Sequence, residues 1–265
     1  MWIDRYRAVL CDLDGCLIAG DRLLPGAQDL VAHLGPRLWI ISNNSTDTPE
    51  TLSVRLSGLG LDIEPSRIVL AGATAVEQLS AEQPDACICV YGSAAIKELA
   101  RATGLRLEAD RPDFVLLTRD EHFSYADLNR VIRQLENGGQ LIVANRDTTH
   151  PGSDGRPVAE TGALLAALAA CLPNVDYREI GKPAPTMYRT VLDRLGLDTV
   201  SVLAVGDNPA TDGEGARRMG MDFVLIGDTG GDMHGRDLSA LLVETGGPLA
   251  AAPGRQARKL GERRR

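Results

Sequence analysis

The sequence predicts an α/β fold with a mainly parallel, doubly wound sheet. Short apolar runs alternate with helical stretches along most of the 265 residues. Three of the apolar runs end in acidic or small polar residues, which is typical of a sheet whose site lies at the carboxyl ends of its strands. With 44% apolar and 24% charged residues and a mean hydropathy of -0.08, the composition is that of an ordinary globular protein.

The expected core elements come from both ends of the chain. The strands of the core sheet are predicted at 7–11, 38–41, 68–70, 200–205 and 223–226. Thr48 or Thr46 is expected to cap the helix after the second strand, with Pro49 in its first turn and Gly58 or Gly60 at its end. A further helix runs to about Gln83, and another begins near Pro209.

The middle of the chain has its own alternating set of elements. Strands are predicted at 87–91, 113–118 and 141–144, and helices at 94–102, 125–136 and 160–171. About 100 residues are enough for a separate domain. We therefore expect a first core part at 1–79, a second domain at 80–178 and a second core part at 179–245. Residues 246–265, rich in Gly, Ala and Pro and then in Arg, predict a flexible C-terminal tail.

Charge and cysteine content limit the class of partner. The net charge is -8 and the pI about 5.1, which argues against nucleic acid or an anionic membrane. The N-terminal residues have no apolar signal segment, and the most apolar helical run, 162–172, is too short to span a bilayer. Five cysteines, an odd number, then indicate reduced thiols in a cytoplasmic protein.

The main candidate for chemistry is the pair Asp12 and Asp14, where the first apolar strand gives way to a loop. A carboxylate can attack phosphorus and form an aspartyl-phosphate, which splits one displacement into two easier ones. A second carboxyl group can protonate the leaving alkoxide and later deprotonate water. Two carboxylates would repel a phosphate unless a cation neutralised them, and Mg²⁺ suits that task because it takes oxygen ligands. Alone, however, such a pair is often only a turn.

Three further features strengthen this interpretation. Asp207 follows the apolar run 200–205 and could complete a metal site, with Asp212 orienting a ligand or Lys182. Ser42 and Asn43 end another apolar run and offer hydroxyl and amide donors to phosphate. Lys182, between Gly181 and Pro183, supplies a fixed cation. Each feature separately could be an ordinary cap, turn or surface charge. Together with the pair Asp12 and Asp14, however, the three features indicate a phosphoryl-transfer site.

These segments resemble the four motifs of the haloacid dehalogenase (HAD) superfamily, and more closely its NagD-like, 4-nitrophenylphosphatase-type branch, subclass IIA. The motifs are 12–17, 42–44, 181–183 and 206–212, and the likeness covers roughly residues 7–230. Further signs of the branch are Pro25-Gly26-Ala27, Asp120 with Tyr125, 144–147 and the Gly-Lys-Pro-x-Pro form of 181–185. The resemblance implies a Rossmann-like HAD core with an inserted α/β cap domain at 80–178.

The resemblance also implies roles for individual residues. Asp12 is the nucleophile, Asp14 the general acid and base, and Lys182 and Ser42 hold the phosphoryl oxygens, with Asn43 beside them. Mg²⁺ lies among Asp12, the backbone carbonyl of Asp14 and Asp207. The supporting residues are Asn208 and Asp212. A cap of this kind excludes water and contributes specificity residues, and the residues expected to face the substrate are Asn145, Arg146 and Asp147.

Asp14 narrows the reaction, because branches that break carbon–halogen bonds lack this carboxylate. The function expected is hydrolysis of small phosphomonoesters, such as nucleotide, sugar, polyol, glycerol or pyridoxal phosphates. A phosphotransferase or mutase with the same machinery, and a phosphate-binding protein without turnover, are the alternatives. Thr118 stands where the branch often has Gly, and Glu160-Thr161-Gly162 replaces its usual Gly-x-Gly. These departures weaken any inference about the substrate. Cap strands could pair between subunits, so a homodimer is also considered.

Overall fold

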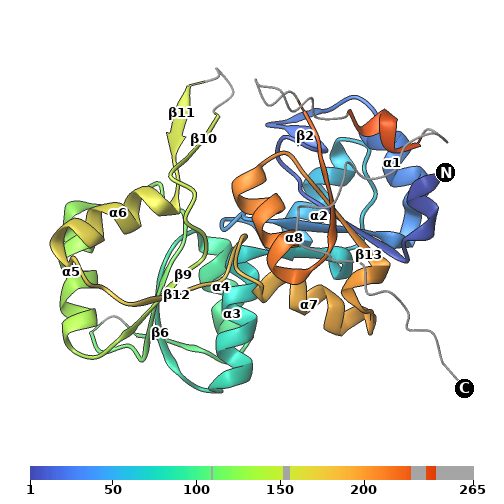
Figure 1. Cartoon of the computed structure of the whole chain (residues 1–265). Helices are drawn as coiled ribbons and strands as arrows, with labels where there is room; N and C mark the ends of the chain where they lie inside the picture. Colours follow the sequence, from blue (N-terminus) through green and yellow to red (C-terminus); the bar gives the residue numbers. More distant parts are fainter. Residues whose placement is uncertain (109, 152–155, 228–236, 243–265) are drawn as a thin grey trace, which may run out of the picture.

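The computed structural model of the chain describes residues 1–108, 110–151, 156–227 and 237–242. It contains two five-stranded parallel sheets, each covered by helices (Figure 1). The predicted tail at 246–265 lies outside the described residues. Within the described parts, no helix has the length and apolar character needed to cross a membrane.

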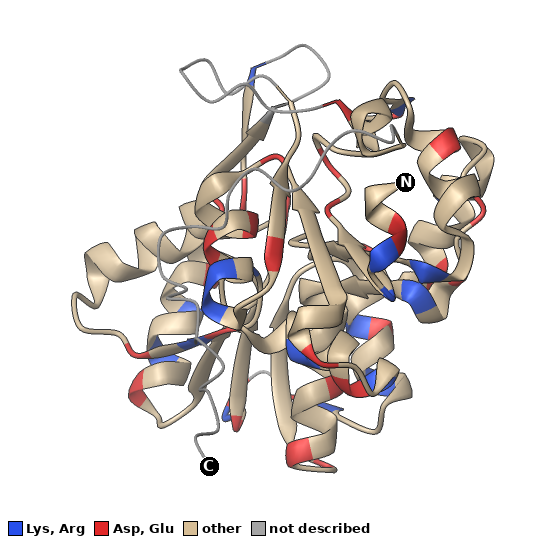
Figure 2. Cartoon of the chain, turned by 45° about the vertical axis from the view of Figure 1, so that its right-hand side comes forward, with Lys and Arg blue, Asp and Glu red and all other residues tan. Residues whose placement is uncertain are grey.

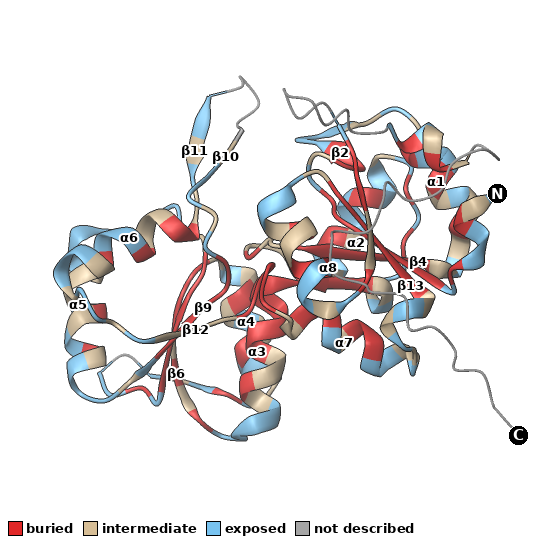
Figure 3. Cartoon of the chain, in the orientation of Figure 1, coloured by how far each residue is buried: buried red, intermediate tan, exposed pale blue. Residues whose placement is uncertain are grey.

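The first sheet has the strand order β14-β13-β1-β4-β5 and is parallel throughout. Its strands, in chain order, are β1 Ala8–Cys11, β4 Leu38–Ser42, β5 Ile68–Leu70, β13 Val202–Gly206 and β14 Asp222–Leu225. The three central strands are buried along their whole length (Figure 3). Burial on both faces explains why they read as continuous apolar runs.

Helices cover both faces of this sheet, as a doubly wound fold requires. Alternate strand residues enter two different apolar clusters, so that Leu10 packs on one face and Val9 on the other. On one face, the first cluster includes residues of α3 Ala71–Glu82, α7 Thr186–Leu195 and α8 Glu214–Met219. The second cluster contains residues of α1 Ala27–Leu34 and α2 Pro49–Gly58. Thr48 caps α2, as one of the two predicted alternatives had it.

The second sheet has the order β12-β9-β8-β6-β7 and is also parallel. Its strands are β6 Cys87–Tyr91, β7 Arg106–Leu107, β8 Phe114–Leu117, β9 Gln140–Val143 and β12 Tyr177–Glu179. Helices α5 Tyr125–Glu136 and α6 Thr161–Cys171 pack on one face. Helix α4 Ala94–Ala102 and helix α3 belong to the cluster on the other face, which continues into the first sheet. The α/β core with an inserted α/β cap is thereby confirmed, whereas its numerical boundaries remain a prediction.

The structure adds short elements that the sequence pattern did not reveal. A hairpin of β10 Thr149–Pro151 and β11 Pro157–Ala159 projects from the cap beyond α6 (Figure 1). A second small hairpin, β2 Ile18–Ala19 with β3 Arg22–Leu23, follows the first motif. The helix expected near Pro209 begins only at Glu214, after a π-helical turn at Pro209–Gly213. These segments are short, and several are polar, so they carry no periodic apolar signal.

Charged residues are interspersed on both units. Acidic and basic residues both occur on the core and on the cap, with neither sign confined to one unit (Figure 2). Many form short local pairs, such as Glu214 with Arg217 and Arg218 on α8. Exposed pairs of this kind contribute little to stability.

Candidate active site

Residues from three strands of the first sheet meet at its carboxyl edge. Asp12 follows β1, Ser42 ends β4 and Asp207 follows β13. Strand β1 lies directly between β4 and β13, so parallel pairing brings these three strand ends together. The Asp12 N–H donates to the Val205 carbonyl at 2.8 Å, which continues the β1–β13 ladder up to the candidate nucleophile.

Lys182 reaches this edge from the loop between β12 and α7. Its ammonium donates to Asp12 Oδ1 and to Asp212 Oδ1, both at 2.6 Å. The Lys182 side chain is 2% exposed, and the two carboxylates are almost as fully buried. A buried charge needs such partners, because desolvation alone would strongly disfavour it. The predicted link between Asp212 and Lys182 is therefore present as a direct contact.

Burial acts on the pKa values of Asp12 and Lys182, two members of the triad that Asp212 completes. Burial raises the pKa of Asp12 well above its usual value, although the adjacent Lys182 favours the charged carboxylate. For Lys182, burial alone would lower the pKa, but the carboxylates of Asp12 and Asp212 outweigh it and hold the pKa well above normal. One lysine thus neutralises less negative charge than the site contains. The arrangement favours an additional cation beside Asp12.

A possible position for that cation lies between Asp12 and Asp207. One side-chain ligand atom from each of Asp12, Cys16 and Asp207 lies within 4.8 Å of the others. Burial, followed by the charge of Asp212, raises the pKa of Asp207 to about 6. A divalent cation compensates the repulsion within such a crowded carboxylate pair, so the donor set fits Mg²⁺.

Two neighbours of the carboxylate pair define its surroundings. Gly15 has φ +80, and a Cβ at this position would lie 2.0 Å from Asp207 Oδ2. Glycine therefore leaves the space that the carboxylate occupies. Cys16, which the sequence argument did not select, approaches the pair as a thiol. Its contact with Cys11 and its burial raise the pKa of the Cys16 thiol well above normal. A protonated sulfur is a poor ligand for Mg²⁺, so oxygen atoms are the suitable donors.

Asp14 lies at the accessible side of the site. Its side chain is exposed, in contrast to that of Asp12. The surrounding protein still desolvates the carboxyl group enough to raise its pKa, and the charges of Arg55, Lys182 and His150 only partly oppose this. An acid with a raised pKa that remains reachable from solvent suits proton transfer.

The motif at 42–44 contributes two polar side chains, Ser42 and Asn43, which have different partners. The Ser42 side chain is 2% exposed, and its Oγ accepts the Asn44 N–H at 3.1 Å. The Asn43 side chain is occupied by protein partners. Its Oδ1 accepts the Lys182 N–H at 2.7 Å, and its Nδ2 donates to Asp147 Oδ2 at 2.9 Å and to the Lys182 carbonyl at 3.1 Å. Both side-chain amide protons of Asn43 are therefore occupied, and neither is left for a phosphate.

The supporting residues Asn208 and Asp212 lie on the turn after β13. The Asn208 side chain caps this turn by accepting the Ala210 N–H at 2.9 Å, while its backbone N–H donates to Asp212 Oδ2 at 3.2 Å. A Cβ on Gly206 would meet Asp212 Cβ at 2.3 Å, so glycine permits this close approach. The turn holds Asp212 against Lys182.

The three residues expected to face the substrate have different positions. Asn145 is 1% exposed, and its Nδ2 donates to the Asn43 carbonyl at 2.7 Å, so its expected substrate-facing position is corrected to a buried link between cap and core. The Arg146 side chain is exposed and pairs with Glu179 on β12 at 2.8 Å. Asp147 binds Asn43. The carboxyl end of β9 thus points toward the core loop after β4, which a cap strand considered alone does not indicate.

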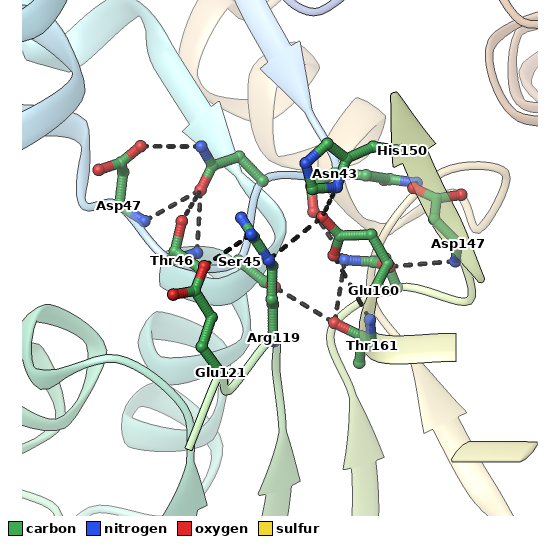
Figure 4. Close-up of polar contacts among 12 residues, drawn as sticks. Asn43, Ser45, Thr46, Asp47, Arg119, Glu121, Asp147, His150, Glu160 and Thr161 are labelled. Atoms are coloured by element: carbon green, nitrogen blue, oxygen red, sulfur yellow. Dashed lines mark hydrogen bonds and ion pairs between the residues drawn. The ribbon is translucent and has the colours of Figure 1, made fainter. Parts of the chain in front are cut away.

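A second polar cluster, missed from the sequence, joins the cap to the same core loop (Figure 4). Glu160 lies 2.8 Å from His150 Nδ1 and 3.7 Å from Arg119 Nε, and Arg119 also pairs with Glu121 at 2.7 Å. The Arg119 N–H donates to Ser45 Oγ at 3.0 Å. These residues come from separate cap segments with no common spacing, so no sequence signal could have selected them.

Comparisons with known proteins agree with this geometry. Residues 9–106 match the family described as haloacid dehalogenase-like hydrolase, and residues 179–240 match a second family of HAD-like hydrolases. Chronophin of Homo sapiens is 33% identical over 242 residues, covering 84% of this chain and 81% of chronophin. The chain belongs to the haloacid dehalogenase-like hydrolases.

Solved structures place the chain within this family. A p-nitrophenyl phosphatase from Archaeoglobus fulgidus superimposes with a TM-score of 0.77 at 26% identity, covering 83% of this chain and 86% of that one. A glycerol phosphate phosphatase from Mycobacterium tuberculosis, in complex with magnesium, has a TM-score of 0.81 at 26% identity, covering 91% and 78%. The resemblance to the 4-nitrophenylphosphatase-type branch is confirmed.

Proposed function

We propose that this HAD-type phosphatase hydrolyses small phosphomonoesters through an aspartyl-phosphate on Asp12, with Mg²⁺ as cofactor. The observation that carries the proposal is the buried contact of Lys182 with Asp12 and Asp212 beside Asp207. It combines a nucleophile, a fixed cation and a further carboxylate at one sheet edge. The magnesium complex of the related glycerol phosphate phosphatase supports the choice of metal.

The carboxylates of Asp12 and Asp207 and the backbone carbonyl of Asp14 would hold the metal. Bound there, Mg²⁺ would neutralise the carboxylates and polarise the phosphoryl group. In the first half-reaction, Asp12 attacks phosphorus, the bond from phosphorus to the ester oxygen breaks, and Asp14 donates its proton to the leaving alkoxide. In the second, Asp14 takes a proton from water, whose oxygen attacks phosphorus and releases inorganic phosphate and the Asp12 carboxylate.

We assign the binding of phosphoryl oxygens to the Lys182 ammonium, the Ser42 hydroxyl and the backbone N–H of Asn43. Preorganised donors of this kind stabilise charge that develops during phosphoryl transfer. The side chain of Asn43 is left out of this assignment because all its polar atoms already have partners. The cap residues Asn145 and Asp147 bond to Asn43 beside this site, and a cap so placed suits a small substrate.

A panel of phosphorylated metabolites tests the proposal. Nucleoside monophosphates, sugar, polyol and glycerol phosphates and pyridoxal phosphate are incubated with Mg²⁺, and inorganic phosphate is measured. We expect release from at least one class and its loss after treatment with EDTA, with recovery on adding Mg²⁺. Transfer of phosphate to an added alcohol, without free phosphate, would instead identify a phosphotransferase. No turnover of any phosphomonoester would contradict the proposal.

Magnesium binding is expected to strengthen as the pH rises. In the metal-free protein the pKa of Asp207 is about 6, and the proton must leave before the carboxylate binds a cation. Between about pH 5 and about pH 7.5 the Mg²⁺ affinity should therefore increase at least tenfold, roughly the change in the ionised fraction of one such group. Isothermal titration calorimetry measures this. The variant Asp207→Asn should bind weakly at both pH values, and an affinity independent of pH in the unchanged protein would refute the assignment.

A further inference from the structure

Asn43 makes an unusual set of contacts for a residue beside an active site. Its side-chain amide bonds both the N–H and the carbonyl of Lys182, at 2.7 and 3.1 Å, and thus holds both peptide groups of the residue that carries the ammonium. Only one orientation of the amide serves these partners, because Oδ1 must face the N–H and Nδ2 the carbonyl. The conformation of the Lys182 backbone is therefore defined by Asn43.

The second proton of the same amide points to the cap. Nδ2 also donates to Asp147 Oδ2 at 2.9 Å, just beyond strand β9, and Figure 4 shows both residues. A neighbouring bond from Asn145 Nδ2 to the Asn43 carbonyl, at 2.7 Å, joins the same two segments. Asp147 is itself held, because its backbone N–H donates to Asn145 Oδ1 at 3.1 Å and its carbonyl accepts the Gly162 N–H at 2.8 Å. The cap therefore orients the amide that holds Lys182.

The local packing leaves little freedom at this junction. The Gly181 N–H donates to the Ala144 carbonyl at 2.7 Å, so the lysine loop bonds directly to the end of β9. A Cβ on Gly181 would lie 2.6 Å from both the Ala144 carbonyl oxygen and Asn43 Oδ1. Glycine is thus needed for the close approach of the three segments.

From these contacts we propose that Asn43 is a positioning residue that aligns Lys182 with Asp12 and is itself oriented by Asp147 of the cap. The inference rests on the proposed function, because it assigns Lys182 a part in phosphoryl transfer. It differs from phosphate binding by the Asn43 side chain, since Asn43 acts through Lys182. A displacement of about 1 Å in such a group can lower the rate about 10²-fold.

Exchanging the two polar partners tests the proposal. Asn43→Asp places a carboxylate against Asp147 and removes the bond to the Lys182 carbonyl, so kcat should fall about 10²-fold while KM changes less than about threefold. Asp147→Asn keeps an acceptor for Asn43 and should lower kcat less than about threefold. In the double variant, the amide at position 147 can donate to the carboxylate at position 43, so the bond between the two residues forms again in the opposite direction. We expect its kcat to be at least about tenfold higher than that of Asn43→Asp alone.

Asn44 offers a matched control. Its Nδ2 donates to Asp47 Oδ2 at 2.8 Å, so Asn44→Asp creates a similar carboxylate pair one residue away without touching Lys182. We expect a decrease in kcat of less than about threefold for this variant. Equal losses for Asn43→Asp and Asn44→Asp, or a double variant no better than Asn43→Asp, would overturn the proposal. Thermal unfolding of every variant shows whether the fold is retained.

A measurement that needs no turnover separates this inference from the proposed function. The chain has three lysines, 97, 182 and 259, so labelling with ¹⁵N-lysine gives a simple NMR spectrum. In Asn43→Ala the Lys182 N–H loses its acceptor, and its exchange with water should accelerate at least about tenfold relative to Lys97. Unchanged exchange would refute the positioning role even in a protein without phosphatase activity. Absence of phosphate release by the unchanged protein would count against the proposed function alone.

Discussion

Replacing Asp12 with Asn is expected to lower kcat by about 10⁴-fold or more, because the amide cannot form the aspartyl-phosphate. Asn can still accept a hydrogen bond from Lys182, so the contact at 2.6 Å has a neutral substitute. The folded protein should be at least as stable as the original, since burial disfavours the Asp12 carboxylate and its removal relieves that cost. Phosphate release and thermal unfolding together measure both effects.

The matched control for this variant is Asp29→Asn on the exposed side of α1. It makes the same chemical change away from the site and should alter neither kcat nor stability appreciably. Mass spectrometry of the unchanged protein, quenched in acid during turnover, should detect phosphate on the peptide that contains Asp12. Turnover by Asp12→Asn at the original rate would contradict the proposed mechanism.

Replacing Lys182 with Met should both impair catalysis and destabilise the fold. The change leaves Asp12 and Asp212 buried without their shared cation, and breaking a buried pair in this way typically costs about 3–5 kcal/mol. Urea denaturation at neutral pH measures the loss. Lys97→Met on α4 is the matched control, and we expect it to change the free energy of unfolding by less than about 0.5 kcal/mol.

The stability loss in Lys182→Met should depend on pH. Burial raises the pKa of Asp12 in the folded protein above its unfolded value. The folded state then binds this proton more tightly than the unfolded state does. Protonation of Asp12 therefore adds to the free energy of unfolding at low pH, and this contribution is lost as the pH rises through the folded pKa. Without Lys182 the pKa rises further, and the destabilisation should be smaller at about pH 5 than at about pH 8. An equal loss at both values would show that repulsion between the carboxylates is not its cause.

Much of the fold could be predicted because its strands and helices have clear periods. The strands around Leu10, Ile40 and Val205 are buried on both faces and read as apolar runs, and the helices 94–102 and 125–136 have the predicted bounds. Strand β12 was missed because its three residues, Tyr177–Glu179, are polar and only half-buried at the sheet edge. A hydrophobic period cannot mark such a short edge strand.

The sequence by itself determined which residue types are available at the strand ends. Asp12, Ser42 and Asp207 could be placed together because neighbouring parallel strands present their carboxyl ends at one edge. Lys182 was also predicted, since a lysine between glycine and proline stands out in a loop. For Asp212 the sequence left two roles open, orienting a ligand or orienting Lys182. The structure shows the contact with Lys182.

Only the tertiary structure decided what Asn43, Asn145 and Asp147 do. Their spacing along the chain says nothing about contact, because 102 residues separate Asn43 from Asn145 and 104 separate it from Asp147. A polar side chain after a strand has the same local sequence whether it faces a substrate or a second domain. Its partners depend on how the cap packs against the core, and packing between segments so distant in sequence is set by the whole fold.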